Sequence, residues 1–349
     1  MRALVTGATG FIGGHLVEAL IGEGFEVTCL TRRTSNLRYL EGLNVSFLRG
    51  DCTDPESLSG VKDFDYVFHL AGLTKAPSDE EAFRVNEECT QNIVAAVMRH
   101  NPCLKRFVYV SSLAAAGPCC QDGPLIEDCE PRPVSVYGET KLGGEKIVLE
   151  QKGKMPFTII RPPAVYGPRD KDMLVIFKMV KLGLIPYWGK SYFSFLYVDD
   201  LVNGIILSAQ KEEGKDEIFF MSDGGIYSSD DLIAAISQAL QCSPIKLGIP
   251  KFVMPLFGAL AEKMPGCSII NPDKMREIRH PYWMCDATKA KEKLGFSPKV
   301  KIKEGAKWTA DWYRIHNWLR PKRLIYLKSF PDLRLRRTFR GRGCILSSG

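Results

Sequence analysis

The 349-residue sequence contains no apolar run close to the roughly 18 residues that a membrane span requires. Its longest candidate, from Phe252 to Ala261, is interrupted by Pro255 and Gly258. We therefore expect no membrane span. We interpret this stretch as a helix of the core or of a lobe surface, with membrane contact as the alternative.

Regular spacing of metal-binding residues is also missing. The eleven cysteines are odd in number and form no CxxC pair, and the five histidines are dispersed. Because disulfide frameworks and zinc sites both show regular spacing, we expect reduced thiols and no metal site. The first strand is expected to begin at Ala3, which leaves no room for a signal or transit peptide. These absences favour a cytoplasmic protein.

Excess positive charge is absent from most of the chain, although the formal net charge is +7. Residues 320–349 hold nine Lys/Arg and one Asp, so the preceding residues sum to −1. Much of the basic charge lies between Arg334 and Arg342. Such a tail can bind nucleic acid or anionic lipid. We expect instead a solvated, disordered extension and no nucleic-acid partner.

What the first half of the chain does contain is an alternation of β-rich runs with helical stretches. Runs such as Val67–Leu70 and Phe107–Val110 are apolar on both faces, as strands buried in a parallel sheet must be. The alternation predicts an α/β fold with a doubly wound parallel sheet, whose ligands bind at the carboxyl ends of the strands. Strands are expected at Ala3–Thr6, Glu26–Leu30, Val45–Arg49, Tyr66–Leu70, Arg106–Ser111 and Thr158–Ile160, and helices at about Ile12–Glu23 and Glu80–Arg99.

The second half is less regular, because prolines and glycines break it into loops. A short strand is expected at Phe195–Val198, and helices are expected near Ser229–Gln241 and Thr288–Leu294. We read these pieces as a smaller C-terminal lobe that covers part of the cofactor. The predicted domains are a cofactor-binding domain at 1–165 to which 195–225 returns, a substrate lobe at 166–194 and 226–315, and the basic tail at 320–349.

A glycine turn follows the first strand, where Thr6 to Gly13 reads Thr-Gly-Ala-Thr-Gly-Phe-Ile-Gly. Gly7 allows a tight turn, Gly10 lets backbone approach phosphate, and Gly13 lets the next helix lie close to the sheet. A strand, a glycine turn and a helix start together hold a dinucleotide pyrophosphate. The turn predicts a nicotinamide dinucleotide as cofactor.

The choice between NAD and NADP depends on the end of the second strand, where an acidic side chain accepts a hydrogen bond from the ribose 2′-hydroxyl of NAD. This chain has Arg32 and Arg33 there and no acid. Two arginines favour the 2′-phosphate of NADP, although they could also be solvated charge. Asp51, after the third strand, is the expected contact to the adenine amino group.

Tyr137 and Lys141 are spaced to project from one face of a helix. A free phenol has a pKa of about 10 and is a poor base at neutral pH. An ammonium some 5 Å away contributes roughly 3 kcal/mol toward the phenolate at an effective dielectric near 20. Ser112, at the end of a strand, is expected to hold the substrate oxygen, with Ser111 as the alternative. We predict proton transfer by Tyr137, tuned by Lys141.

These motifs in this order resemble the extended short-chain dehydrogenases/reductases, also described as the NAD-dependent epimerase/dehydratase family, over about residues 1–315. The resemblance implies a Rossmann-type fold and catalysis by Ser112, Tyr137 and Lys141. The matching stretches are Thr6–Gly13, Gly50-Asp51, Phe68–Gly72, Asn86, Ser111-Ser112, Tyr137 with Lys141, Arg161–Pro168, Tyr197–Leu201, Lys289-Ala290 and Leu294–Phe296. The cofactor contacts that it implies are Gly7, Gly10, Phe11, Ile12, Asp51, Leu70 and Val165.

The chain differs from the family's sugar-nucleotide epimerases at several positions where those epimerases share a residue type. They tend to have Asn where this chain has Ala164, Arg near Phe193, and a polar stretch in place of Arg279–Trp283. Ser112–Ala114 lacks both acids of the sugar dehydratases. The sequence is more similar to dihydroflavonol reductase-like and 3β-hydroxysteroid dehydrogenase-like members, which act on larger, less charged substrates.

Aromatic residues at Leu184–Trp188 and Tyr192–Phe195 are expected to line the mouth of the site or to pack the lobe core. Our hypothesis is an NAD(P)-dependent oxidoreductase that interconverts a carbonyl and a secondary alcohol on a fairly apolar small molecule. The alternatives are an NAD-dependent nucleotide-sugar epimerase and a non-catalytic dinucleotide sensor. By the resemblance, a homodimer through helices near 80–100 and 137–151 is expected.

Overall fold

The computed structural model describes residues 1–120, 123–249 and 272–319. Its main feature is a seven-stranded sheet in the order β11-β6-β5-β4-β1-β2-β3, with every pair parallel. This confirms the predicted doubly wound sheet. The chain order reverses between β1 and β4, which opens a crevice at their carboxyl ends. The strands are β1 (Arg2–Thr6), β2 (Glu26–Thr31), β3 (Val45–Arg49), β4 (Tyr66–His69), β5 (Arg106–Val110), β6 (Phe157–Arg161) and β11 (Glu217–Phe220).

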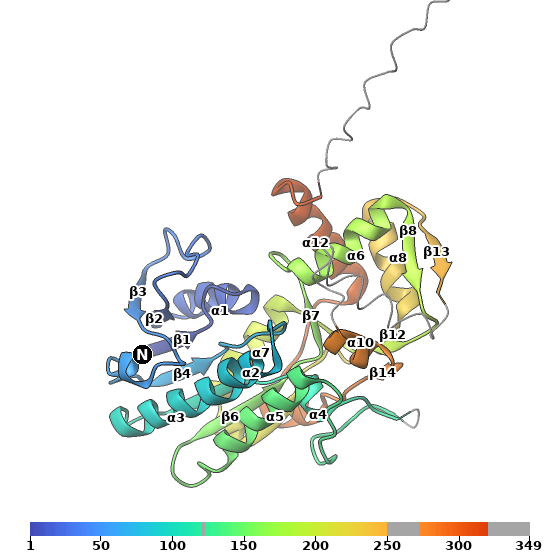
Figure 1. Cartoon of the computed structure of the whole chain (residues 1–349). Coiled ribbons are helices and arrows are strands. Elements are labelled where there is room, and N and C mark those ends of the chain that lie inside the picture. Colours follow the sequence, from blue (N-terminus) through green and yellow to red (C-terminus); the bar gives the residue numbers. More distant parts are fainter. Residues whose placement is uncertain (121–122, 250–271, 320–349) are drawn as a thin grey trace, which may run out of the picture.

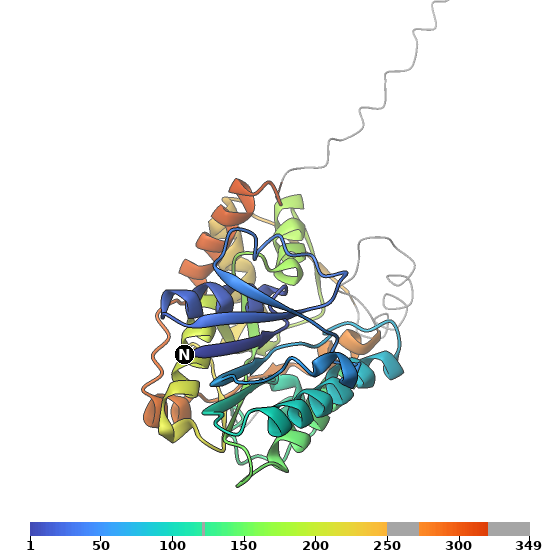
Figure 2. The ribbon, with the colours of Figure 1, turned by 90° about the vertical axis from the view of Figure 1, so that its left-hand side faces the viewer.

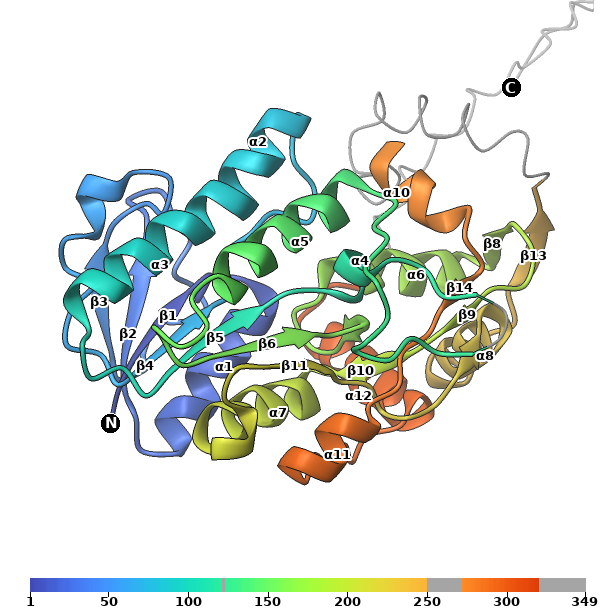
Figure 3. The ribbon, with the colours of Figure 1, turned by 90° about the horizontal axis from the view of Figure 1, so that it is seen from below.

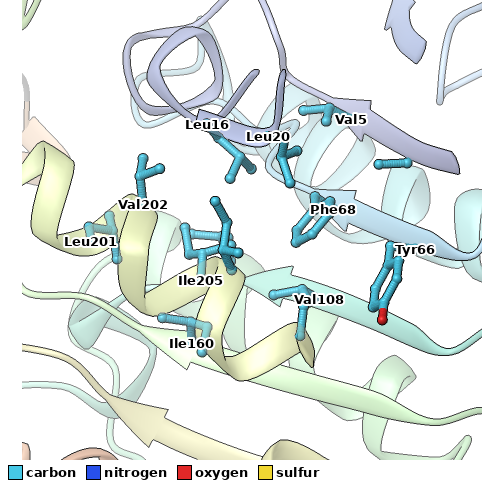
Figure 4. Close-up of a cluster of buried hydrophobic side chains, with 14 of the residues drawn as sticks. Val5, Leu16, Leu20, Tyr66, Phe68, Val108, Ile160, Leu201, Val202 and Ile205 are labelled. Atoms are coloured by element: carbon cyan, nitrogen blue, oxygen red, sulfur yellow. The ribbon is translucent and has the colours of Figure 1, made fainter. Parts of the chain in front are cut away.

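Helices cover both faces of this sheet (Figure 3). On one face lie α1 (Phe11–Gly22) and α7 (Val198–Gln210). Their side chains, such as Leu16 and Ile205, pack on Phe68 in a buried cluster (Figure 4). On the other face lie α3 (Cys89–His100) and α5 (Val136–Leu149), over a second apolar cluster. Two-sided burial explains why the central strands are apolar throughout.

The helix predicted from Glu80 to Arg99 exists but is not regular. It begins with α2 (Asp79–Phe83), whose N-cap is Ser78, and passes through a π-helical segment η2 (Arg84–Glu88) into α3. A π turn holds one residue more than an α turn. It therefore rotates the residues that follow, and hydrophobic periodicity alone does not reveal it.

The smaller lobe gathers at one end of the sheet (Figure 1). Its core packs Phe177, Ile236 and Tyr313 from α6, α8 and α12 against short strands. The lobe pieces are β7 (Ala164–Tyr166), α6 (Lys171–Leu182), β8 (Leu184–Tyr187), β9 (Tyr192–Phe193), β10 (Phe195–Tyr197), β12 (Tyr227–Ser228), α8 (Ser229–Leu240), β13 (Ile245–Gly248), α10 (Pro272–Ile278), β14 (Tyr282–Trp283) and α12 (Ile302–Ile315). Short β-sheets join β10 to β7, β12 to β9 to β14, and β13 to β8.

Four short helices complete the described chain: η1 (Pro55–Leu58), α4 (Leu113–Ala116), η3 (Glu212–Gly214) and α11 (Thr288–Leu294). Within the described ranges, no helix combines the length and the apolarity that crossing a membrane requires. The predicted helix at Phe252–Ala261 and the basic tail lie outside the described residues.

Candidate active site

The glycine turn lies where the carboxyl ends of β1 and β4 meet. Gly7 has φ +70°, and a Cβ there would stand 2.7 Å from the backbone of Leu70 and Ala71. A Cβ on Gly13 would stand 2.1 Å from the carbonyl oxygen of Gly7. Both positions therefore require glycine for close backbone approach, as the sequence predicted.

The N-terminus of α1 faces the same strand ends and has no side-chain cap. Gly10 is its N-cap residue, with no side-chain hydrogen bond, so the first-turn N–H groups around Phe11 and Ile12 lack a side-chain acceptor. Unpaired N–H groups and the helix dipole suit an anion. On these observations the residues present fit a dinucleotide pyrophosphate.

The residues expected at the adenosine end lie at the ends of β2 and β3. Arg32 and Arg33 are exposed. Arg49 donates from Nη1 to Thr31 Oγ1 at 3.1 Å and to the Arg32 carbonyl at 3.2 Å. Asp51 is half-buried, and its Oδ1 accepts hydrogen bonds from Thr53. The second strand thus ends among three arginines, with no acid at the expected position.

Two expected cofactor contacts, Leu70 and Val165, are half-buried. Leu70 directly follows β4, and the neighbouring Ala71 N–H donates to Thr6 Oγ1 at 3.1 Å. Val165 lies in β7 and packs at the border of the core beneath α1. Leu70 is therefore at the crevice, and Val165 lies on its lobe side.

Ser112 and Tyr137 come together although 25 positions separate them. Ser112 is the N-cap of α4, where its Oγ accepts from Ala114 N–H at 3.1 Å, and its side chain is close enough to the Tyr137 phenol to lower the pKa of that group. Ser111 is buried, and its Oγ makes no hydrogen bond to any described residue. The geometry therefore favours Ser112 over Ser111 as the partner of Tyr137.

Burial controls the protonation of the Tyr137 phenol. Desolvation raises its pKa to about 12, and the hydrogen bond from Ser112 lowers it only in part. Lys141 is not among the groups that shift this pKa. The expectation that Lys141, together with the oxidised nicotinamide ring, lowers the phenol's pKa stays a prediction. Among the described residues, burial keeps Tyr137 an O–H donor at neutral pH.

Lys141 is buried on the next turn of the same helix. Its Nζ lies 4.2 Å from the centroid of the Tyr109 ring. Desolvation lowers the pKa of the amine to about 7, and the negative charge of Glu145 opposes this change. The amine of Lys141 is therefore poised between its charged and neutral forms near neutral pH.

A carboxylate from the lobe caps α5, and no pattern in the sequence indicated it. Asp273 in α10 accepts from Val136 N–H at 2.7 Å and from Tyr137 N–H at 3.1 Å. On the same short helix, Glu277 accepts from Ser135 Oγ at 2.8 Å. Asp273 also borders a pocket beside Tyr137, whose other walls include Leu73, Lys75, Ala76 and Val136. These contacts join residues about 140 positions apart, so no local pattern could predict them.

Asn86 in the π turn holds the loop after β4 against α5. Its Oδ1 accepts from Leu73 N–H at 2.7 Å, and its Nδ2 donates to the Leu73 carbonyl and to Thr140 Oγ1. Asn86 is therefore a brace for this loop and for α5.

The aromatic residues expected near the mouth mostly pack the lobe core. Phe195 is buried, and Phe193 and Tyr187 pack against the same cluster. Tyr192 stacks on Tyr282 with 5.7 Å between centroids. Of the two expectations, core packing describes these residues better.

Comparisons with known proteins agree with this geometry. A model of the NAD dependent epimerase/dehydratase family matches residues 3–221. A ceramide reductase from Caulobacter vibrioides is 28% identical, over 92% of this chain and 96% of that protein. A UDP-glucose 4-epimerase from Vibrio cholerae is 27% identical, over 88% and 94%. The crystal structure of the Thermotoga maritima UDP-glucose 4-epimerase with UDP-glucose superposes with a TM-score of 0.75 and 25% identity, over 91% of this chain and all of that one.

Proposed function

The chain belongs to the NAD-dependent epimerase/dehydratase family, and on that premise we propose that it is an NAD(P)-dependent oxidoreductase that interconverts a carbonyl and a secondary alcohol on a fairly apolar small molecule. The observation that carries the proposal is that the Ser112 side chain lies beside the Tyr137 phenol, with Lys141 buried one turn away on the same helix. These three groups are the catalytic residues of the proposed reaction.

A bound nicotinamide supplies or accepts the hydride of such a reaction. Ser112 holds the substrate oxygen, since its hydroxyl is already directed to Tyr137. Tyr137 carries its proton at neutral pH, because burial raises the pKa to about 12, and it donates that proton as negative charge develops on the oxygen. The nearby Lys141 ammonium stabilises the phenolate that remains. In the oxidising direction the same proton returns to Tyr137.

Three observations support an apolar substrate. Ala164 is exposed where sugar-nucleotide epimerases tend to have Asn, so an amide that could hold a diphosphate is missing there. The relative from Caulobacter vibrioides, which matches nearly the whole chain, is named for the reduction of a ceramide. The pocket beside Tyr137 contributes apolar wall from Leu73, Ala76 and Val136.

A direct assay tests the reaction. The purified chain is mixed with NADPH or NADH and a long-chain aliphatic ketone, and the absorbance of the reduced cofactor is followed. We expect Tyr137→Phe to lower the rate about 10²-fold or more, because the proton donor is lost. Tyr192→Phe, which removes a phenol on β9, is the matched control and should retain the rate. An active Tyr137→Phe enzyme would rule out the proposed mechanism.

The proposed preference for NADP rests on Arg32 and Arg33. A 2′-phosphate would gain charge-assisted hydrogen bonds from an exposed arginine pair that no acid neutralises at the strand end. We expect Arg32→Ser with Arg33→Ser to lower kcat/KM for NADPH about tenfold or more and to leave NADH nearly unchanged. Equal losses with both cofactors would count against this preference.

Nucleotide-sugar epimerisation is the second candidate, favoured by the Vibrio cholerae and Thermotoga maritima relatives. An epimerase would convert UDP-glucose to its 4-epimer with no net consumption of added cofactor. A non-catalytic sensor would bind the dinucleotide and consume none with either substrate. Mass spectrometry of ligands that co-purify under native conditions separates these outcomes, since retained NAD with a sugar nucleotide would favour the epimerase.

A further inference from the structure

The smaller lobe exposes an aliphatic patch far from the residues assigned to the reaction. Leu182, at the end of α6, is 83% exposed, and Leu184 in β8 is 49% exposed. In β13, Ile245 is 71% and Leu247 is 51% exposed. We call these four residues the tip patch. Single exposed aliphatic residues are common, but adjacent ones on a folded surface mark an interaction site.

Backbone pairing makes the tip patch continuous. Ile245 N–H donates to the Gly183 carbonyl at 2.8 Å, and Ile245 lies opposite Leu184 in the parallel β8–β13 pair. Leu247 lies opposite Pro186 in the same pair. The exposed side chains therefore belong to neighbouring backbone segments of one small sheet.

The ends of α8 and α12 adjoin the tip patch. Cys242 Sγ, just after α8, donates to the Val180 carbonyl in α6. Arg314 in α12 donates to the Ala239 carbonyl in α8, and the next residue, Ile315, is 75% exposed. Figure 1 shows α12, α6 and α8 next to one another in the upper part of the lobe, and Figure 2 shows the lobe from the side.

The charge around the tip patch is mostly positive. Residues 178–190, 232–249 and 312–319 contain no Asp or Glu. They contribute exposed Lys178, Lys181, Lys246, Arg314 and Lys190 instead. Two acids from the same helices pair with this set, since Lys246 contacts Asp230 and Arg314 contacts Asp311. The patch is cationic although residues 1–319 sum to −1.

The basic tail begins at this same place. Lys181 Nζ donates to the carbonyl of Leu319, the last described residue. The 30 residues that follow hold nine Lys/Arg and one Asp. The segment that carries these nine basic residues therefore follows a residue that contacts Lys181, the neighbour of Leu182.

We propose that the tip patch docks the protein on an anionic membrane surface, toward which the positive charge of residues 320–349 adds attraction. The aliphatic side chains enter the boundary between headgroups and acyl chains, and the lysines and arginines contact anionic headgroups. Lysine stems lie along apolar surface while their ammonium groups stay in water. Stable membrane attachment takes two such signals, and the tip combines an apolar and a basic one. This docking is independent of the proposed reaction.

Vesicle co-sedimentation of the full chain tests the docking. We expect binding to phosphatidylcholine vesicles that contain phosphatidylserine, little binding to pure phosphatidylcholine, and release by salt. Leu182→Ser with Ile245→Ser should weaken binding about tenfold or more, because two exposed aliphatic side chains are lost. Ile126→Ser with Phe47→Ser, which removes two exposed apolar residues on the main domain, should bind like the parent.

A second variant, Arg334→Gln with Arg336→Gln and Arg337→Gln, tests how much the basic tail contributes to vesicle binding. It should also weaken that binding. Loss with this variant but not with the tip variant would overturn the role of the patch. The role of the patch would also be overturned if the tip variant melted at a lower temperature, since this chain would then cover the patch. The same holds if the variant converted a dimer to a monomer, since a second copy would then cover it. Binding to duplex DNA without binding to anionic vesicles would overturn the membrane as partner. Activity of the chain on ketones bears on none of these outcomes.

Discussion

At the scale of single residues, the candidate site is governed by desolvation. Burial holds Tyr137 in its protonated form and pushes Lys141 toward its neutral form. Each change favours the uncharged state, as expected for groups removed from water. The two residues therefore form a nearly neutral pair in which the phenol holds its proton far more tightly than the amine does.

The buried amine of Lys141 should make stability depend on pH. Folding lowers its pKa from 10.5 to about 7, so between these values the unfolded chain binds more protons than the folded one. The free energy of unfolding should rise with pH across this window, by up to about 1.4 kcal/mol per pH unit from this group. Urea unfolding of the parent and of Lys141→Met at several pH values isolates the effect. A parent and a variant with parallel pH profiles would contradict it.

The residues that the sequence predicted for the site are those with a local reason to be where they are. Gly7 and Gly13 are required by close backbone approach, and Lys141 follows Tyr137 by one turn. Asp273 could not be found in this way, because its contacts with Val136 and Tyr137 depend on how the lobe packs on the main domain. The roles of these residues in cofactor binding and catalysis stay predictions.

At the scale of elements, α5 begins between two acceptors. Ser135 accepts from Gly138 N–H at 3.1 Å, and the Asp273 carboxylate accepts the two N–H groups before it. A helix N-terminus with both acceptors is fixed in position and in direction. The phenol of Tyr137 therefore depends on α10, an element of the lobe.

Asp273→Ala should lower kcat more than it raises KM, because Tyr137 would lose its fixed position. The lost cap should cost about 1 kcal/mol of stability, and Asp273→Asn, which keeps one acceptor, should recover part of both. The matched control is Asp286→Ala, which removes a similar acceptor from the N-terminus of α11. If Asp286→Ala and Asp273→Ala lowered kcat equally, the positioning role would be excluded; a shift of the pH–rate profile in Asp273→Ala alone would support it.

A buried ion pair ties α5 to β6. Arg161 donates from Nε and Nη2 to the two carboxylate oxygens of Glu145, at 2.9 and 2.6 Å, and both side chains are almost fully buried. Arg161→Met should cost about 3–5 kcal/mol, because it leaves a buried carboxylate uncompensated. Adding Glu145→Gln should restore part of that loss. Arg132→Met, in the exposed pair with Glu130, should cost less than about 1 kcal/mol; equal costs for the two single variants would refute the argument.

The strands of the sheet were predictable, as was the lobe helix α8, whereas most short strands of the lobe were not, for one physical reason. A strand such as Phe107–Val110 is buried on both faces, and this shows as a continuous apolar run. The lobe strand Tyr192–Phe193 has two residues, and it pairs with Tyr227–Ser228 and Tyr282–Trp283. Pairings over such separations are decided by tertiary packing, and no residue pattern marks them.

At the scale of the whole molecule, the helical layer of α2, α3 and α5 leaves apolar side chains in solvent. Phe83, Met98 and Leu149 are 38–40% exposed, one on each helix. We predict that this layer forms a homodimer, because a self-complementary apolar face suits a two-fold interface. Sedimentation equilibrium should give a dimer that Met98→Glu with Leu149→Glu converts to a monomer. Phe47→Glu, on the edge strand β3, should stay dimeric, and a monomeric parent chain would end the proposal.

The π turn at Arg84–Glu88 requires this segment to keep its number of residues. Its additional residue brings Asn86 to Leu73 and Thr140, so the same brace would miss both partners if one residue were removed. Surface loops accept insertions and deletions at small entropic cost, whereas this stretch has no such tolerance. In related sequences we therefore expect gaps to fall outside residues 84–88, even where the residue types there have changed. Chain length, rather than side-chain identity, would then be what selection preserves at this turn.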